Sequence, residues 1–221
     1  LHEAVSLLNV NGPSKLVSGN HITRLADRLN DPALPPTGIR VQESVPASVV
    51  DNVVLGDPAN PSPTTRGLYL DNSKQTTVGC NRLAGLGIGL EARFDCLNST
   101  LTNNVFRSCS TGVQLTDNGV LGLQGTPTTS NNNVWSQCRV GLKSVESDGR
   151  QSPFFVPSAG SSQLPGVPGY FLSPANGSTI STDLLNTVGV PDCLFPGPYP
   201  CEMPIVPCAG GCGFDLVAVR N

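Results

Sequence analysis

The sequence contains little charge. Only 13% of its 221 residues are Asp, Glu, Lys or Arg, whereas about a quarter of a typical soluble domain is charged. Helix surfaces need more of these residues than this, so we expect little helix. The formal net charge is −3 and basic residues form no cluster, so the chain lacks the surface with which proteins hold nucleic acid or anionic membranes. We expect neither partner.

Long apolar runs are also absent. No segment approaches the ~18 consecutive apolar residues of a membrane span. The first residues, Leu1-His-Glu, lack the charged, apolar and cleavage regions of a signal peptide. We therefore expect no membrane span, and a chain that is either mature or cut from a longer polypeptide.

Signatures of common enzyme classes are missing as well. The two histidines, His2 and His21, follow no catalytic pattern. No serine lies in a nucleophile elbow, and no glycine-rich phosphate loop follows a strand and opens a helix. We expect no cofactor.

Glycine, proline and cysteine are plentiful instead. The 24 glycines and 20 prolines indicate many turns, and a hydrophobic content of 38% is sufficient for a core. The eight cysteines are an even number, which favours disulfides and an oxidising compartment. We therefore expect a secreted, extracellular or cell-surface protein.

One short sequence motif, the asparagine motif, recurs along the chain. An asparagine is followed by an apolar residue two positions later, and in four of five copies by another apolar residue five positions later. A glycine follows each copy, and in four of the five copies it opens an apolar-x-apolar run. The separations of 23 to 32 residues between the asparagines are typical of a solenoid. The asparagines are Asn20, Asn52, Asn81, Asn104 and Asn133, and the glycines are Gly38, Gly67, Gly89, Gly112 and Gly141.

Aligning the copies produces columns of similar residues. The apolar runs after the glycines have a period of two, which marks strands with one buried face. Each unit is too short to bury that face alone, so the units must stack, with parallel strands ~4.8 Å apart between coils. This predicts an all-β parallel β-helix of about five coils over residues 1–147. A β-sandwich with unrelated Asn and Gly turns is the alternative, but the shared register favours the β-helix.

Three segments resemble a known family: Asn104-Val-Phe-Arg-Ser-Cys-Ser-Thr-Gly-Val-Gln-Leu115, Gly122-Leu-Gln-Gly125 and Asn132-Asn-Val-Trp135. They resemble the right-handed, pectate-lyase-like β-helix repeats of secreted bacterial surface proteins, especially Bacteroidota cargo of type IX secretion. The resemblance covers about residues 14 to 147. It implies a right-handed coil, whereas the same repeat serves enzymes, adhesins and fibres.

The asparagines are expected to form a structural column. An asparagine amide offers two donors and an acceptor, and the residue tolerates the left-handed backbone of a sharp corner. We therefore predict hydrogen bonds from coil to coil between Asn20, Asn52, Asn81, Asn104 and Asn133.

The outward positions of the strands offer a ligand-binding face. We expect the side chains there to face solvent, where Tyr69 between Arg40 and Glu91 is suited to bind carbohydrate by stacking and hydrogen bonds. The full set is Arg40, Tyr69, Glu91, Gln114 and Lys143.

Carboxylates are the other candidates for chemistry. Polysaccharide lyases of this fold need clustered carboxylates for calcium and a basic proton acceptor, and glycoside hydrolases need two or three carboxylates around one sugar. Asp117 and Glu146 align at the strand exits of successive coils, in a column with Glu43, Asn72 and Phe94. They are either a catalytic pair or a solvated edge.

The cysteines near the repeats suggest crosslinks. Cys109 and Cys138 share an inward column, where they either bond or pack as small apolar thiols. Cys80 and Cys96 lie in turns that flank the third coil, and we favour a disulfide between them.

The last four cysteines lack the paired two-residue gaps of zinc ribbons. We therefore expect two disulfides of open connectivity and no metal among Cys193, Cys201, Cys208 and Cys212.

The chain divides after the repeats. Residues 148–221 are rich in Pro, Gly and Ser, and we expect an extension with a Cys-rich end that packs on the helix or leaves it. The strand pattern of residues 4–11 has no polar cap before it. We therefore expect the coil ends to contact other parts of a longer chain or further copies, as in a filament.

These observations favour a non-catalytic extracellular module that serves as an adhesive or assembly scaffold, with carbohydrate as a ligand. A polysaccharide lyase or glycoside hydrolase of the same fold is the alternative. A phage or fibre component is a third hypothesis.

Overall fold

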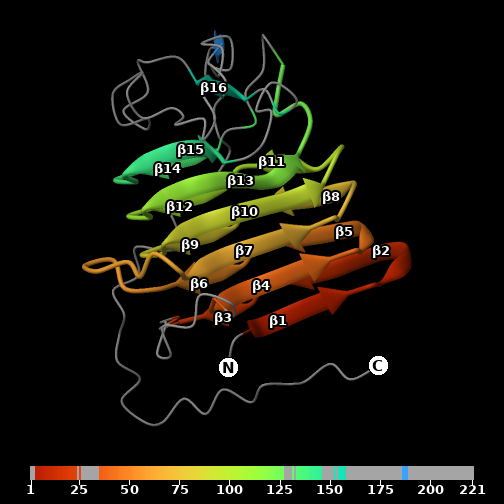
Figure 1. Ribbon diagram of the computed structural model, residues 1–221, viewed down its shortest axis with the longest axis horizontal. Coiled ribbons are helices and arrows are strands. Elements are labelled where there is room, and N and C mark those ends of the chain that lie inside the picture. The colour runs from red at the N-terminus through yellow and green to blue at the C-terminus, as the bar shows by residue number, and fades with distance from the viewer. Residues whose placement is uncertain are drawn as a thin grey trace. The chain divides into compact units, whose positions relative to one another are not determined.

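The computed structural model describes residues 3–23, 25, 35–126, 131, 133–145, 152, 154–157 and 186–188. The regular elements within these ranges are all β-strands, which lie in successive layers (Figure 1). The described residues contain no helix that is long and apolar enough to cross a membrane. The predicted all-β parallel architecture is confirmed.

Three parallel sheets form the faces of the stack. Sheet A contains β1 (Glu3–Leu8), β4 (Thr37–Gln42), β7 (Arg66–Asp71), β10 (Ile88–Asp95), β13 (Thr111–Val120) and β15 (Val140–Ser144). Sheet B contains β2 (Asn11–Ser18), β5 (Val45–Val50), β8 (Thr76–Gly79) and β11 (Thr100–Thr102). Sheet C contains β3 (His21–Ile22), β6 (Val53–Leu55), β9 (Arg82–Ala84), β12 (Val105–Arg107) and β14 (Val134–Ser136).

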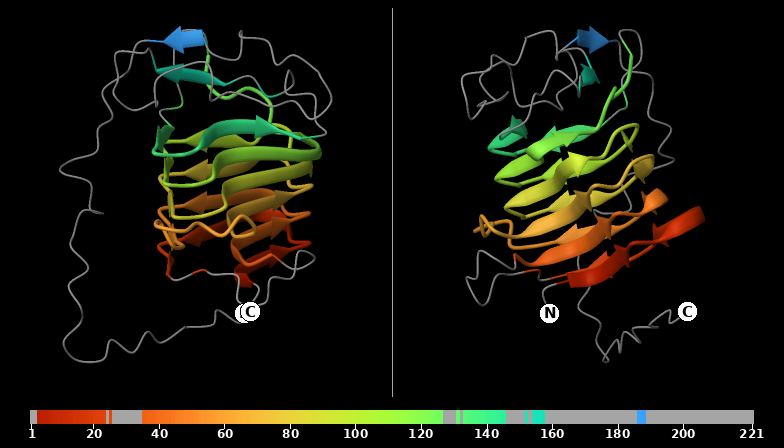
Figure 2. Two further views of the ribbon diagram at one scale, coloured as in Figure 1. Left: turned by 60° about the vertical axis from the view of Figure 1, so that its left-hand side comes forward. Right: turned by 45° about the vertical axis from the view of Figure 1, so that its right-hand side comes forward.

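The chain visits sheets A, B and C in turn, so that each coil lies directly on the preceding one (Figure 2). Glu91 of β10, for example, pairs with Tyr69 of β7 on one side and with Gln114 of β13 on the other. In the fifth coil, Gln124 takes the place of a sheet B strand and forms an isolated bridge with Phe154. Five coils reach sheet C, and β15 begins a sixth.

The core is a continuous apolar column between the three sheets. The ring of Phe106 stacks on that of Trp135 with centroids 5.7 Å apart, and Phe154 meets Trp135 edge-on at 6.4 Å. Burial of these aligned positions is the main force that holds coil to coil. The buried columns contain Ile39, Leu68, Leu90, Val113 and Leu142 in sheet A, Val17, Val49, Val78 and Leu101 in sheet B, and Val54, Leu83, Phe106 and Trp135 in sheet C.

The glycine that opens a strand of sheet A makes room for the core. A β carbon at Gly112 would lie 2.3 Å from Cδ1 of Trp135 and 2.6 Å from the carbonyl oxygen of Gly141. The ring of sheet C therefore fills the corner that a side chain would need. This explains why the apolar residue two positions after the asparagine of the motif recurs together with the glycine that opens the next strand of sheet A.

The asparagine column joins the coils at the corner between sheets B and C. The Asn104 side-chain oxygen accepts hydrogen bonds from the backbone N–H and from Nδ2 of Asn81, both at 3.0 Å. Its Nδ2 donates to Asn133 Oδ1 at 2.9 Å and to the Val78 carbonyl at 2.8 Å. Equivalent bonds between neighbouring asparagines link Asn20, Asn52, Asn81, Asn104 and Asn133.

The left-handed residue of this corner precedes the asparagine. Positive φ angles occur at Gly19 (67°), Asp51 (57°), Cys80 (54°) and Asn103 (55°), whereas the column asparagines have none. The expectation that the asparagines themselves take this conformation is therefore wrong. The preceding residue turns the chain, which leaves the asparagine side chain aligned with its neighbours in the stack.

The structure continues beyond residue 147, where we place the end of the coils. The Leu121 backbone N–H donates to Ser152 Oγ at 2.9 Å, and β16 (Phe155–Pro157) pairs with β17 (Asn186–Val188). Residues 192–221, which include the last four cysteines, lie outside the described residues. The domain boundary itself stays a prediction.

Candidate functional site

The five outward residues of sheet A lie in one column, as their spacing predicts. Their exposure differs from the expectation. Tyr69 is 5% exposed and Glu91 is 4% exposed, so the prediction that all five face solvent is wrong for these two. Arg40, Gln114 and Lys143 are half-buried. A ligand-binding role for the column stays a prediction.

Two arginines bury the Tyr69 ring. The guanidinium carbons of Arg40 and Arg66 lie 5.4 Å and 4.7 Å from the ring centroid. Arg66 also forms an ion pair with Glu91, whose carboxylate accepts a hydrogen bond from Thr116 Oγ1 at 2.8 Å. Because the two guanidinium groups cover the ring and leave Tyr69 only 5% exposed, the ring is unavailable for stacking on a sugar. The repeat pattern does not predict that Arg66 covers Tyr69 and pairs with Glu91.

The Tyr69 hydroxyl connects this column to the end of the strand. It donates to Asp71 Oδ2 at 3.3 Å and accepts from Arg93 Nη1 at 3.5 Å. Burial raises the pKa of Tyr69 above its ordinary value of 10.0, and the Arg93 hydrogen bond partly offsets this rise. The same bond raises the pKa of Arg93. Arg93 Nε in turn pairs with Asp117 Oδ2 at 2.5 Å.

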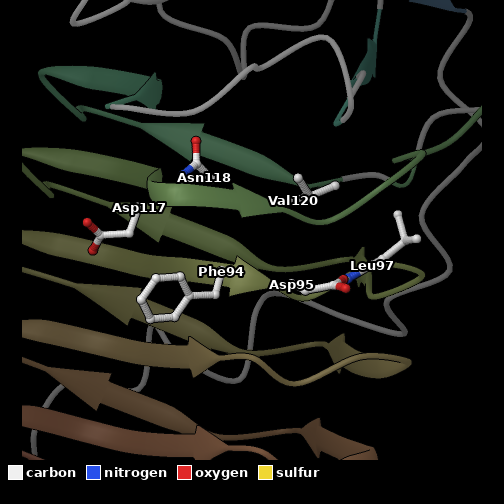
Figure 3. A pocket seen from close by; sticks show the side chains of 6 residues that line it. All are labelled: Phe94, Asp95, Leu97, Asp117, Asn118 and Val120. Atoms are coloured by element: carbon white, nitrogen blue, oxygen red, sulfur yellow. The ribbon is translucent and has the colours of Figure 1, made fainter.

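A pocket of about 370 Å³ lies beyond this ion pair, where the fourth and fifth coils leave sheet A. Figure 3 shows the side chains of β10 and the following turn beneath those of β13. The lining residues are Phe94, Asp95, Leu97, Asp117, Asn118 and Val120.

A bulge in β13 shapes the pocket. Arg93 pairs with Thr116, but Asp95 pairs with Val120, so β13 carries extra residues opposite the end of β10. Asp117 and Asn118 have φ angles of 49° and 59°, a conformation that Asp and Asn tolerate better than most residues. A β carbon at Gly119 would lie 2.3 Å from the Ala92 carbonyl oxygen. The bulge therefore requires glycine and presents two polar side chains.

The pocket combines apolar and polar surface. Phe94 is 42% exposed, and the Arg93 guanidinium carbon lies 4.5 Å from its ring centroid. Asp95 pairs with Lys74 at 2.7 Å, and the hydrogen bond from Lys74 lowers the pKa of Asp95. An accessible ring beside fixed carboxylates and the exposed Asn118 amide is suited to a ligand with both an apolar face and hydroxyl groups.

The structure describes only one residue of the predicted acidic pair. Asp117 lines the pocket, whereas Glu146 lies outside the described residues, so their neighbourhood stays a prediction. Phe94 appears in the predicted strand-exit column but not as a site residue. The Asn118-Gly119 dipeptide inside a strand pattern is a turn signal that indicates a bulge.

The cysteines near the coils carry thiols in this structure. Cys80 follows β8, and Cys96 lies before β11, so the paired strands of sheet B separate them. The disulfide predicted between these two residues is therefore not formed. Burial raises the pKa of Cys96 to about 11. Cys109 and Cys138 are buried, and their side chains interact with one another.

Of three comparisons with known proteins, only the one with family models gives a match. Neither the search of curated proteins nor that of solved structures found a match. The model of the family described as the right-handed β-helix region matches residues 10–152, which is more than half of the chain. The matched segment begins before β2 and contains both the asparagine column and the pocket. The chain therefore belongs to the right-handed β-helix family.

Proposed function

We propose that this protein is a non-catalytic, extracellular or cell-surface module that uses the β-helix as an adhesive scaffold and binds carbohydrate in the Phe94 pocket. The observation that carries the proposal is the exposed Phe94 ring beside Asp95, Asp117 and Asn118. The surface location and the bacterial type IX origin rest on the cysteine content and on the sequence resemblance, and they belong to the proposal.

The chemistry of the pocket favours a neutral saccharide. A sugar ring has an apolar C–H face that packs on an aromatic ring, and its hydroxyls donate to carboxylate oxygens. Asp117 and Asp95 are balanced by Arg93 and Lys74, so the pocket lacks the excess charge that would select a cationic or anionic ligand. The ion pairs also fix both carboxylates before a ligand arrives, which lowers the entropy cost of binding.

Binding to a panel of neutral polysaccharides, measured by affinity electrophoresis and then by calorimetry, tests the proposal. Phe94→Ala is expected to weaken binding about tenfold, because it removes the stacking surface. Leu16→Ala is the matched control, since Leu16 is 64% exposed on sheet B, away from the pocket. Unchanged binding by Phe94→Ala, with the fold intact by circular dichroism, would overturn the proposed site.

The enzyme alternative is favoured by one observation, the presence of two carboxylates in one pocket. A glycosidase needs one of them as a protonated acid with a raised pKa. The Lys74 contact instead lowers the pKa of Asp95, which suits a fixed acceptor. Release of reducing ends or unsaturated sugars by the parent, with loss of that activity in Asp117→Asn, would replace the scaffold proposal by the enzyme.

A further inference from the structure

Cys109 and Cys138 occupy equivalent positions in the fourth and fifth coils. Arg107 pairs with Ser136, and the Arg139 backbone N–H donates to the Cys109 carbonyl at 3.0 Å, so the chain stays in register past both cysteines. Neighbouring strands lie ~4.8 Å apart. This spacing falls within the roughly 4.4–6.8 Å between Cα atoms that a disulfide spans.

Both thiols are directed toward the preceding coil. Cys109 Sγ donates to the Leu83 carbonyl, and Cys138 Sγ donates to the Phe106 carbonyl, each at 3.5 Å. Cys138 therefore reaches from the fifth coil into the fourth, which contains Cys109. The Cys138 side chain interacts with that of Cys109, and this interaction together with burial raises the pKa of Cys109.

We propose that Cys109 and Cys138 form a disulfide during folding in an oxidising compartment and so link the fourth coil to the fifth. The oxidant is a disulfide such as oxidised glutathione. One cysteine loses its proton to solvent, attacks the oxidant as a thiolate and expels one glutathione thiolate. The other cysteine then attacks the mixed disulfide and expels the second. The protein loses two protons and two electrons, and the oxidant takes them up to become two thiols.

The link joins the two coils that form the pocket. Phe94 and Leu97 belong to the fourth coil, whereas Asp117 and Asn118 belong to the fifth. A crosslink of this kind restricts the unfolded chain and holds the two coils in register at the corner after sheet C. Because both thiols are buried and the Cys109 pKa is raised, the folded dithiol reacts slowly and the bond must form before burial.

Peptide mapping of the full chain tests the link. The protein is refolded from the reduced state in a glutathione redox buffer, and its thiols are alkylated after denaturation in acid. Trypsin releases residues 108–139 as one peptide that contains both cysteines and no other, whereas Cys96 lies in a separate peptide. We expect the 108–139 peptide to lack both labels and to be lighter by two hydrogens, with Cys96 labelled. Full labelling of Cys109 and Cys138 in refolded protein would overturn the proposal.

Thermal unfolding with and without reductant gives a second readout. The oxidised wild type is expected to unfold roughly 5–10 °C higher than the reduced protein through this link. The part of this temperature difference that the link causes should be absent in Cys138→Ala and retained in Cys96→Ala. Any disulfides among the last four cysteines would respond to reductant in all three proteins, so an equal response in the wild type and Cys138→Ala would count against the link.

Discussion

Asn104 illustrates how a single side chain joins three coils at the residue scale. Its amide accepts two hydrogen bonds from Asn81 and donates to Val78 and Asn133, all from a fully buried position. Because each buried group that loses its partner costs about 1–3 kcal/mol, the column stabilises the stack as well as aligning it.

Asn104→Ala should therefore lower the free energy of unfolding by about 3 kcal/mol. Urea denaturation measures the change. Asn60→Ala is the control, because Asn60 is exposed in a loop, and it should remain within about 0.5 kcal/mol of the wild type. Equal effects of the two substitutions would contradict a stabilising role for the column.

The burial of Tyr69 predicts how the stability of the folded protein depends on pH. Its pKa in the folded protein lies above 10.0, mainly because of burial. The folded state therefore keeps its proton while the unfolded state ionises, and stability that is present below pH 10.0 declines as the pH rises through the folded pKa.

Tyr69→Phe should remove this part of the decline. Denaturation of both proteins between about pH 9 and pH 11 measures the difference in slope. The difference between the tyrosinate absorbance titrations of the wild type and Tyr69→Phe isolates this residue among the three tyrosines. A Tyr69 that ionises with an ordinary pKa, or parallel slopes for the two proteins, would show that the arginine-covered site opens to water.

At the scale of elements, the glycines that open sheet A determine how closely sheets A and C approach. Gly112→Ala should destabilise the protein by about 3 kcal/mol, because the added carbon would meet the Trp135 ring and the Gly141 carbonyl. Gly79→Ala, also in a strand, meets its nearest atoms at 3.5 Å and 3.7 Å and should leave stability unchanged or raise it by about 0.5 kcal/mol. Thermal denaturation compares them, and a mild effect at Gly112 would contradict this packing.

The stacking of elements could be predicted from the sequence because it depends on period. Residues such as Leu68 and Leu90 recur in register, and burial of both is confirmed. The burial of Tyr69 could not be predicted in this way. It depends on Arg66 at the start of β7 and on Arg40 in the neighbouring coil, whose side-chain directions no periodicity specifies.

The pocket forms where a bulge in β13 interrupts the regular repeat of the coils. Alignment of the strand exits places Phe94 and Asp117 in one column, but the bulge at Asn118 and Gly119 opens the space between coils. A repeat pattern predicts what neighbouring coils share, and this pocket arises where the fifth coil departs from the fourth.

At the scale of the whole molecule, the described coils combine a regular stack with one irregular site. The buried columns and the asparagine column fix the register, and the polar network over sheet A ends at the Arg93–Asp117 ion pair that borders the pocket. This arrangement suits a rigid support that presents one binding site.

The most direct test compares two surfaces in one binding assay. Calorimetric titration of the best-retained neutral polysaccharide is carried out with the wild type, with Phe94→Ala, and with Gln114→Ala combined with Lys143→Ala on the sheet A column. Binding in the Phe94 pocket predicts about tenfold weaker affinity for Phe94→Ala and wild-type affinity for the sheet A double variant. Loss of affinity in the double variant, with Phe94→Ala unaffected, would contradict this account by placing the ligand on sheet A.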